Sequence, residues 1–437
     1  MKSPFNLAFT TTFSGSVAAG TTAASDVGPA NIDQVFGHDH LKPLKEMQHN
    51  RMLAGQSVLD LSMVNPDLAP PRIMIDRLLE AVTKPVSHRY AVSRGVRRLR
   101  DGFAEKYAYR FGINLDPERQ VCVCLGSKDA TFHALRVLVH PRDSVVVAAP
   151  AYPALLSAVA LVGGVSVEWR HSTDPERAAQ DPERAAQDPE SAAQSLAQLL
   201  DTSGAKVLLL NFPSNPAGTV VSAQWWERIG AVCAARGVTI INDFVYGEMC
   251  FSGTPAVSAL SVTKQGARCV EVYSLSKAYN VPGWRVGALV GDEAIVRTVA
   301  RLKSHADYGL FLPLQYAAAV ALTAKEDLVR QTVSTYERRI RVLTSGLTKL
   351  GWDVTEPQAG ACVWARFPLS LQTKSEGRFG SIAVAESLLS NGGVMVAPGS
   401  VFGEGFNDYV RFAAVVSEER MREVVSAIAK LSNANSR

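Results

Sequence analysis

A lysine, Lys277, stands among hydroxyl side chains and ahead of an arginine, a pattern suited to binding an aldehyde that carries a phosphate. The segment reads Ser274-Leu-Ser276-Lys277-Ala-Tyr-Asn-Val-Pro-Gly-Trp-Arg285-Val-Gly. A lysine amine condenses with a carbonyl to form a Schiff base, and serine hydroxyls with a guanidinium suit a dianionic phosphate. A lysine flanked by serines is more commonly a solvated surface residue, but these flanks favour chemistry. The cofactor they imply is pyridoxal phosphate.

The pattern Ser-x-Ser-Lys-x-x-x-x-Pro-Gly-Trp-Arg-x-Gly resembles the lysine signature of the class I/II aminotransferases, which are fold type I pyridoxal-phosphate enzymes. A strand end at 271–274 and an apolar strand at 285–290 place Lys277 on a loop. Loops on rigid scaffolds commonly carry catalysis. The resemblance implies that Lys277 is the catalytic residue, and that Ser274, Ser276 and Arg285 hold the cofactor phosphate.

Two polar side chains, Asp243 and Tyr246, follow the apolar run 238–242, at the end of a predicted buried strand. Parallel sheets bind ligands at this edge. A carboxylate beside a pyridine nitrogen keeps that nitrogen protonated, and a phenol can hydrogen-bond the ring oxygen. The resemblance gives these roles to Asp243 and Tyr246. Without it, Asp243 would be interpreted as a helix cap or turn residue.

Two further turns follow apolar runs. Asn215 lies in an Asn-Pro-Ala-Gly turn that resembles the family's Asn-Pro-x-Gly turn, whose asparagine donates to the ring oxygen; alone it is an ordinary turn. Gly126, Ser127 and Lys128 open a predicted helix, whose free N–H groups attract anions. These three residues match the family's phosphate-binding turn, and otherwise they would be an ordinary helix cap.

Two tyrosines match aromatic positions of the family. Tyr152, after the run 144–149, resembles the ring that stacks on the cofactor, although it could equally pack under a loop. Tyr90, in the segment 88–95, resembles the tyrosine that reaches the phosphate of the neighbouring subunit. The resemblance therefore implies a homodimer with shared active sites. The Ser-Arg-Gly after Tyr90 and the Asp-Tyr-Gly at 307–309 are most similar to the alanine and LL-diaminopimelate aminotransferase branch.

Three residues are expected to meet the substrate. Arg411 follows the Gly-rich segment 398–405 and matches the arginine that clamps the substrate α-carboxylate as a bidentate pair; a structural salt bridge is the alternative. Val64 and Asn65 belong to a segment that lies over the substrate in the family, which usually has glycine where Val64 stands. Valine adds bulk and resists positive φ. Val64 could therefore alter substrate choice or the reaction itself, or be accommodated by a small backbone adjustment.

The arrangement of elements predicts an α/β protein. Between residues 80 and 325, apolar strand-like runs alternate with helical patterns, which indicates a mostly parallel sheet flanked by helices. We expect a large cofactor-binding domain over 71–325 and a smaller α/β domain built from both chain ends, 31–70 and 326–437. Closure of the domains would bring Arg411 to the cofactor and exclude water.

Composition favours a cytoplasmic enzyme. The chain has 437 residues, 47% hydrophobic and 20% charged, with a net charge of +4. It has no long basic run that would indicate nucleic-acid binding and no apolar run near the roughly 18 residues that a membrane span needs. The six cysteines lack paired metal spacing and are interpreted as reduced core thiols, with no metal site. Residues 1–30 are interpreted as a disordered tail, not a signal peptide.

A heptad, Asp174-Pro-Glu-Arg-Ala-Ala-Gln180, recurs at 181–187 and, with Ser191 for Arg, at 188–194. Each unit has a proline and no large apolar residue, so a coiled coil is excluded. We expect a solvated surface loop or short helical turns over 174–194, with a partner-binding element as the alternative.

These features predict ping-pong transfer of an amino group from an L-amino acid to an α-keto acid, with Lys277 moving the α-proton as general acid and base. One alternative keeps the cofactor but catalyses β- or γ-elimination or replacement, cyclisation or oxidation. A second is a non-catalytic or regulatory protein, against which the intact Lys277, Asp243 and Arg411 argue. A distal substrate carboxylate would need another cation, for which Arg89, Arg94 and Lys303 all remain open.

Overall fold

The computed structural model describes residues 41–171, 188–251, 253–371 and 380–435. The tail expected at 1–30 and the first two heptads, 174–187, lie outside the described residues. None of the described helices is both long and apolar enough to cross a membrane.

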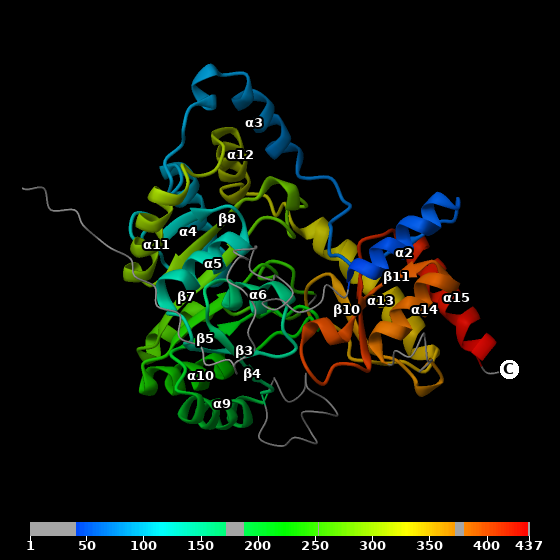
Figure 1. Cartoon of the computed structure of the whole chain (residues 1–437). Coiled ribbons are helices and arrows are strands. Elements are labelled where there is room, and N and C mark those ends of the chain that lie inside the picture. The colour runs from blue at the N-terminus through cyan, green and yellow to red at the C-terminus, as the bar shows by residue number, and fades with distance from the viewer. Residues whose placement is uncertain (1–40, 172–187, 252, 372–379, 436–437) are drawn as a thin grey trace, which may run out of the picture.

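A seven-stranded sheet forms the larger part of the molecule (Figure 1). Its strands are β2 (Val121–Cys124), β3 (Ser144–Ala148), β4 (Val165–Trp169), β5 (Val207–Leu210), β6 (Thr239–Asp243), β7 (Arg268–Ser274) and β8 (Gly287–Gly291). They lie in the order β2-β8-β7-β6-β5-β3-β4. Neighbours are parallel except at β8, which is antiparallel to β2 and β7. The expected α/β fold with a mostly parallel sheet is confirmed.

Both faces of this sheet are covered by helices, because its strands are apolar at successive positions. In β3, Val145 and Val147 face one hydrophobic cluster, which includes α5 (Ser127–Leu138), α6 (Pro153–Leu161) and α11 (Glu293–Ala306). Val146 and Ala148 face the opposite cluster. That cluster includes α4 (Arg97–Phe111), α9 (Pro189–Ser203), α10 (Ala223–Arg236) and α12 (Leu312–Leu322).

A smaller part is assembled from both ends of the chain. Strands β9 (Asp353–Val354), β10 (Cys362–Arg366), β12 (Ala397–Pro398) and β13 (Tyr409–Ala413) form an antiparallel sheet in the order β12-β13-β10-β9. Near the N-terminus, β1 (Leu59–Asp60) pairs in parallel with β11 (Val394–Met395). Helices α2 (Leu41–Leu53), α13 (Arg330–Lys349), α14 (Ser381–Gly392) and α15 (Glu418–Asn435) lie with these strands, to one side of the large sheet (Figure 1). The domain boundaries at 70/71 and 325/326 stay predictions.

Helix α3 (Arg72–Val82) leads from the smaller part across α12 at the outer end of the large part (Figure 1). The remaining short helices are 3-10 turns: η1 (Pro85–His88), η2 (Ala259–Gln265), η3 (Pro282–Trp284), η4 (Leu369–Leu371) and η5 (Gly399–Phe402). Between them, α3 and η1 carry the chain to the segment that holds Tyr90.

The third heptad belongs to a longer, partly buried helix, where a solvated surface loop or short helical turns were expected over 174–194. Its residues 188–194 cap and begin α9, whose first residue is Pro189. The Asp188 side chain accepts hydrogen bonds from the N–H groups of Glu190 and Ser191, so it is the N-cap. Proline is tolerated in the first turn because its missing N–H would have no partner there. Ala192 and Leu196 anchor the helix in the core.

Candidate active site

Lys277 lies in the turn that follows β7, as the sequence predicts, with its amine turned into the protein. Its Nζ donates a hydrogen bond to the main-chain oxygen of Val64 at 2.6 Å. Burial lowers the pKa of Lys277 to about 8, with Arg411 and Arg285 lowering it further while Cys362 and Asp243 act in the opposite direction. Near neutral pH a useful fraction of this amine is therefore uncharged and nucleophilic.

Asp243 ends β6 and is 3% exposed. Its Oδ1 has no hydrogen-bond partner among the described residues. Burial raises the pKa of Asp243 to about 7, although the N–H of Val245 and the charge of Lys277 lower it. A buried carboxyl with an unpaired oxygen suits a cationic N–H group, such as a protonated pyridine nitrogen. This pocket therefore fits the cofactor that the sequence implies.

Two asparagines that sequence reasoning missed hold this edge of the sheet. Asn211 donates from Nδ2 to the carbonyl oxygen of Asp243 at 2.6 Å. Asn242 donates to Phe212 O at 3.0 Å and to the buried carboxylate of Glu271 at 3.1 Å. Each asparagine stands at the end of an apolar strand, which was a usable signal because a buried amide there requires a specific partner.

The predicted phosphate-binding residues meet where β2, β7 and the start of α5 converge. Gly126 has φ +80°, and a Cβ at this position would collide with the guanidinium of Arg285. Arg285 donates to Leu125 O at 3.3 Å and Pro282 O at 3.0 Å. Ser274 and Ser276 are joined by an Oγ to Oγ hydrogen bond of 2.9 Å. A cation, two hydroxyls and a helix start thus form a cradle for a dianion.

The other two residues of the predicted phosphate turn differ in exposure. Ser127 begins α5 and is half-buried, whereas Lys128 is exposed. Arg285 also departs from expectation in its backbone: it precedes β8 and has a left-handed conformation with φ +55°, so it is not part of the strand expected at 285–290. From this turn its guanidinium lies against Gly126.

Arg411 on β13 is 5% exposed and reaches across to the asparagine turn. Its Nη1 donates to Asn215 Oδ1 at 3.1 Å, and its Nη2 donates to the main-chain oxygen of Ser62. The guanidinium carbon lies 5.0 Å from the centre of the Phe402 ring. Within the described residues it has no carboxylate partner, so the structural salt bridge considered from the sequence is not found there. A buried arginine in this state suits a carboxylate ligand.

The two aromatic rings expected near the cofactor lie at strand ends. Tyr246 is 2% exposed, and burial followed by the charge of Cys362 raises its pKa well above its ordinary value. Tyr152 caps the start of α6 and is half-buried. The residue before it, Ala151, donates its N–H to Phe402 O at 2.7 Å, which fixes this loop against the smaller sheet.

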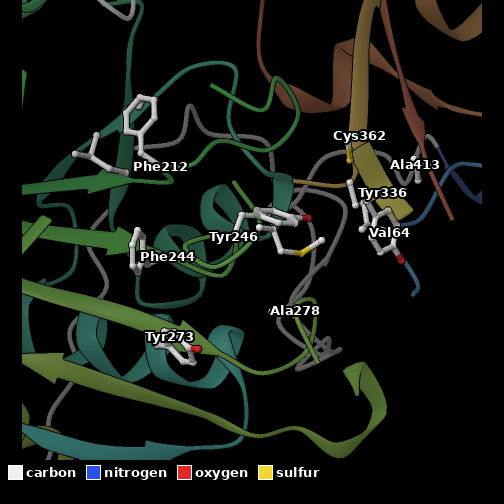
Figure 2. Close-up of a cluster of buried hydrophobic side chains, with 14 of the residues drawn as sticks. Val64, Phe212, Phe244, Tyr246, Tyr273, Ala278, Tyr336, Cys362 and Ala413 are labelled. Carbon is white, nitrogen blue, oxygen red and sulfur yellow. The ribbon is translucent and has the colours of Figure 1, made fainter. Parts of the chain in front are cut away.

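Val64 closes the site beside Lys277. It is 7% exposed and belongs to the same hydrophobic cluster as Tyr336, Cys362 and Ala413, which Figure 2 draws together at one side of the close-up. Val64 is not among the non-glycine residues with positive φ, so the valine causes no such strain. Cys362 was interpreted from the sequence only as a core thiol. It packs in the cluster beside Val64, whose main-chain oxygen accepts from Lys277.

Asn65 and Tyr90 are exposed on this chain. Asn65 follows Val64, and the segment is anchored by Asp67, which accepts hydrogen bonds from Arg339 at 2.6 and 2.8 Å. Tyr90 is 83% exposed, and its ring centre lies 4.5 Å from that of Tyr308. Of the other predicted residues, Val64 approaches from the segment after β1, Arg411 lies on β13, and the rest end or follow strands of the large sheet or precede β8.

A buried lysine of lowered pKa, an aspartate with an unpaired oxygen and a cradle suited to a dianion lie at the edge of a mostly parallel sheet, as a pyridoxal-phosphate enzyme of fold type I requires. The family model for aminotransferase class I and II matches residues 56–428, and the chain belongs to this family. It is therefore a pyridoxal-phosphate-dependent aminotransferase, and the fold, cofactor and activity predicted from the sequence are confirmed.

Relatives place the chain in the predicted branch. It is 32% identical to the glutamate-pyruvate aminotransferase AlaC of Escherichia coli, over 87% of this chain and 88% of that one. It is 31% identical to an LL-diaminopimelate aminotransferase of Dehalococcoides mccartyi, over 90% and 97%. A single mutant of Thermus thermophilus aspartate aminotransferase is similar in structure, with TM-score 0.81 and 25% identity over 92% of this chain and 99% of that one. These three names differ in substrate.

Proposed function

We propose that this aminotransferase works as a cytoplasmic homodimer in which Lys277 transfers the substrate α-proton, Arg411 binds the substrate α-carboxylate, and each site is completed by Tyr90 of the partner. The observation that carries the assignment is the pairing of a buried amine of lowered pKa with a buried guanidinium that has no acidic partner in the described part of the chain. An α-amino acid substrate needs both groups: an amine to accept and return its α-proton and a guanidinium to bind its carboxylate.

When bound, pyridoxal phosphate accepts the amino group and withdraws electrons from the substrate α-carbon. Ser274, Ser276, Arg285 and the N–H groups at the start of α5 would hold its phosphate. Asp243 would pair with the ring nitrogen, and a cationic partner there stabilises the ionised carboxylate that burial disfavours. The ring oxygen would be bound by Asn215 and Tyr246, with Tyr152 stacked against the ring face.

Lys277 is suited to move a proton in both directions. Its pKa of about 8 is close to physiological pH, which is where a general acid and base is most effective. The Val64 carbonyl accepts from the amine and orients it. Since this acceptor is a main-chain oxygen, it does not depend on the identity of the side chain at position 64.

Arg411 would bind the substrate carboxylate through two parallel N–H groups. Asn215 Oδ1 and Ser62 O already accept hydrogen bonds from the guanidinium, and Phe402 packs on its face. These contacts fix the plane of the guanidinium before substrate arrives, so less freedom is lost on binding. The substrate would therefore be held by its carboxylate while Lys277 acts on the neighbouring carbon.

The proposed dimer surface is the face that carries Tyr90. Over half of the large apolar side chains that are exposed in the described residues lie in the segments 73–92 and 308–311. Ring contacts join these segments. The ring centres of His88 and Phe311 are 5.7 Å apart, and those of Tyr90 and Tyr308 are 4.5 Å apart. A concentrated apolar face of this kind is typical of a protein interface. A second copy of this chain would cover it and bring Tyr90 to the partner's phosphate cradle.

Mixed dimers test this proposal. Lys277→Ala subunits have no reactive amine, and Tyr90→Phe subunits retain the amine but cannot complete the partner's site. In a mixed dimer, the Tyr90→Phe subunit receives an intact Tyr90 from its Lys277→Ala partner, so one complete site is formed. We expect activity above the sum of the two parents at limiting cofactor. Activity equal to that sum, or a monomer in sedimentation equilibrium, would contradict the shared site.

A further inference from the structure

The ammonium of Lys303 is sealed inside the protein, which excludes it as the second cation left open for a substrate carboxylate. Its side chain is 0% exposed, in the last turn of α11. The Nζ donates to Asp129 Oδ2 at 3.1 Å and to Asp307 Oδ2 at 2.7 Å. A buried charge persists only when it is paired in this way. Lys303 is therefore committed to two carboxylates, and each of these has a second contact.

The first carboxylate holds the phosphate-binding turn. Asp129 Oδ2 also accepts the N–H of Leu125 at 2.8 Å, while the carbonyl of Leu125 accepts from Arg285 at 3.3 Å. The residue that precedes Gly126 is thus held on both sides of its backbone. His133 adds a contact to Asp129, 3.2 Å from Nδ1 to Oδ1. The orientation of the first N–H groups of α5 depends on this bracing.

The second carboxylate holds the segment behind Tyr90. Asp307 Oδ1 accepts the N–H of Gly309 at 2.6 Å. Gly309 has φ +79° and no room for a side chain, because a Cβ there would lie 2.7 Å from the Val92 carbonyl oxygen and 3.1 Å from Ser93 Cα. The residue between Asp307 and Gly309 is Tyr308, whose ring packs on that of Tyr90. The turn at 307–309 is therefore a close-fitting support for the exposed Tyr90.

We propose that Lys303, through Asp129 and Asp307, is a positioning residue that couples the phosphate-binding turn of its own subunit to the Tyr90 that completes the partner's site. The coupling to the partner rests on the shared site proposed above. Asp129, His133 and Asp307 have ligand atoms within 4.8 Å of one another, a spacing that a metal ion could use. The ammonium of Lys303 already supplies the positive charge between the two carboxylates.

The first test measures cofactor release from the holoenzyme after dilution, for Lys303→Met and Asp129→Asn. Lys303→Met removes both hydrogen bonds to the carboxylates, and Asp129→Asn replaces a charged acceptor with a neutral amide. We therefore expect release at least about tenfold faster. The matched control is Asp292→Ala, which removes the N-cap of the same helix without touching either turn. The control is informative where it lowers the melting temperature as much as the test variants do. It should then still release cofactor at the wild-type rate. Equal acceleration in the control would reduce Lys303 to a structural role and overturn the proposal.

The second test asks in which subunit the Asp307→Asn defect appears. Mixed dimers contain one Lys277→Ala subunit, whose site is emptied by dialysis, so retention reports only the other site. Asp307→Asn on the Lys277→Ala subunit should accelerate release from the intact partner strongly, because it loosens the Tyr90 that completes that site. The same change on the intact subunit should accelerate release less, because it acts only indirectly, through Lys303 and Asp129. The reverse pattern would overturn the coupling. A protein that forms no dimer would overturn both the shared site and the coupling between subunits. Cofactor release from Asp129→Asn would still show whether Asp129 braces the phosphate-binding turn.

Discussion

The amine of Lys277 donates to the main-chain oxygen of Val64 at 2.6 Å, and this contact joins the proposed catalytic residue of the large part to a segment from the N-terminal side of the chain. The segment is fixed in turn by Asp67, whose exposed carboxylate pairs with the buried Arg339 on α13. The position of the amine therefore depends on the packing of the smaller part, because the acceptor moves with that segment.

Val64→Gly tests whether the valine directs the reaction. The hydrogen bond to Lys277 involves the main chain, and Val64 has no positive φ to relieve, so we expect transamination to remain the reaction. The space opened beside Tyr336 and Cys362 should change KM among amino acids of different size. Product analysis without a keto acid acceptor is the measurement. Continuous turnover by the wild type, lost in Val64→Gly, would instead favour elimination or another reaction.

The pKa of Lys277 predicts how cofactor capture depends on pH. The uncharged amine is the reactive form, and its pKa of about 8 lies below the ordinary lysine value near 10.4. The rate at which the protein binds added pyridoxal phosphate covalently should rise up to about pH 8 and then level off. The control is Lys277→Ala, which should show no covalent capture at any pH. A rate that continues to rise through pH 10 would mean that burial does not lower this pKa.

Asp243→Asn should make the cofactor-free protein more stable and the enzyme much less active. The folded-state pKa of Asp243 is raised to about 7, so between pH 4 and 7 the folded state binds more protons here than the unfolded state, and stability falls as pH rises. A neutral amide removes this penalty, worth up to about 4 kcal/mol at pH 8 and much less at pH 5. Urea unfolding at the two pH values measures the difference. An equal effect at both would contradict the assigned cause.

Arg411→Lys should raise KM for amino acids by about a hundredfold, because a lysine cannot form the bidentate pair and leaves Asn215 or Ser62 without a donor. Reaction of a primary amine that has no carboxylate should change little. Arg366→Lys is the matched control, since that arginine lies on the adjacent strand in an exposed ion pair with Asp408. Equal losses with both kinds of substrate would show that Arg411 acts on the fold and not on the carboxylate.

The sequence predicted those parts of the site that follow from local patterns. Apolar runs that end in turns located Asp243, Asn215 and Gly126 at strand ends, because parallel strands present their carboxyl ends along one edge. The apolar runs 238–242 and 144–149 were likewise found as the strands β6 and β3. The assignment of chemistry to these positions came from the resemblance, since each motif alone is an ordinary turn or cap.

Contacts between distant positions could not be predicted in this way. Lys303 reaches Asp129, and Lys277 reaches Val64, only because the completed fold packs these segments together. Cys362 resembled other core thiols, and nothing in an apolar strand indicates that it packs beside Val64. The left-handed turn at Arg285 was missed because the apolar residues that follow it favour a strand.

The most direct test of the account is the stoichiometry of keto acid released when an amino acid is added to the holoenzyme without an acceptor. Amino-group transfer through Lys277 predicts one equivalent of keto acid per subunit, then no further product until a keto acid is supplied, and no product from Lys277→Ala. Continuous release without an acceptor, or full release by Lys277→Ala, would contradict it.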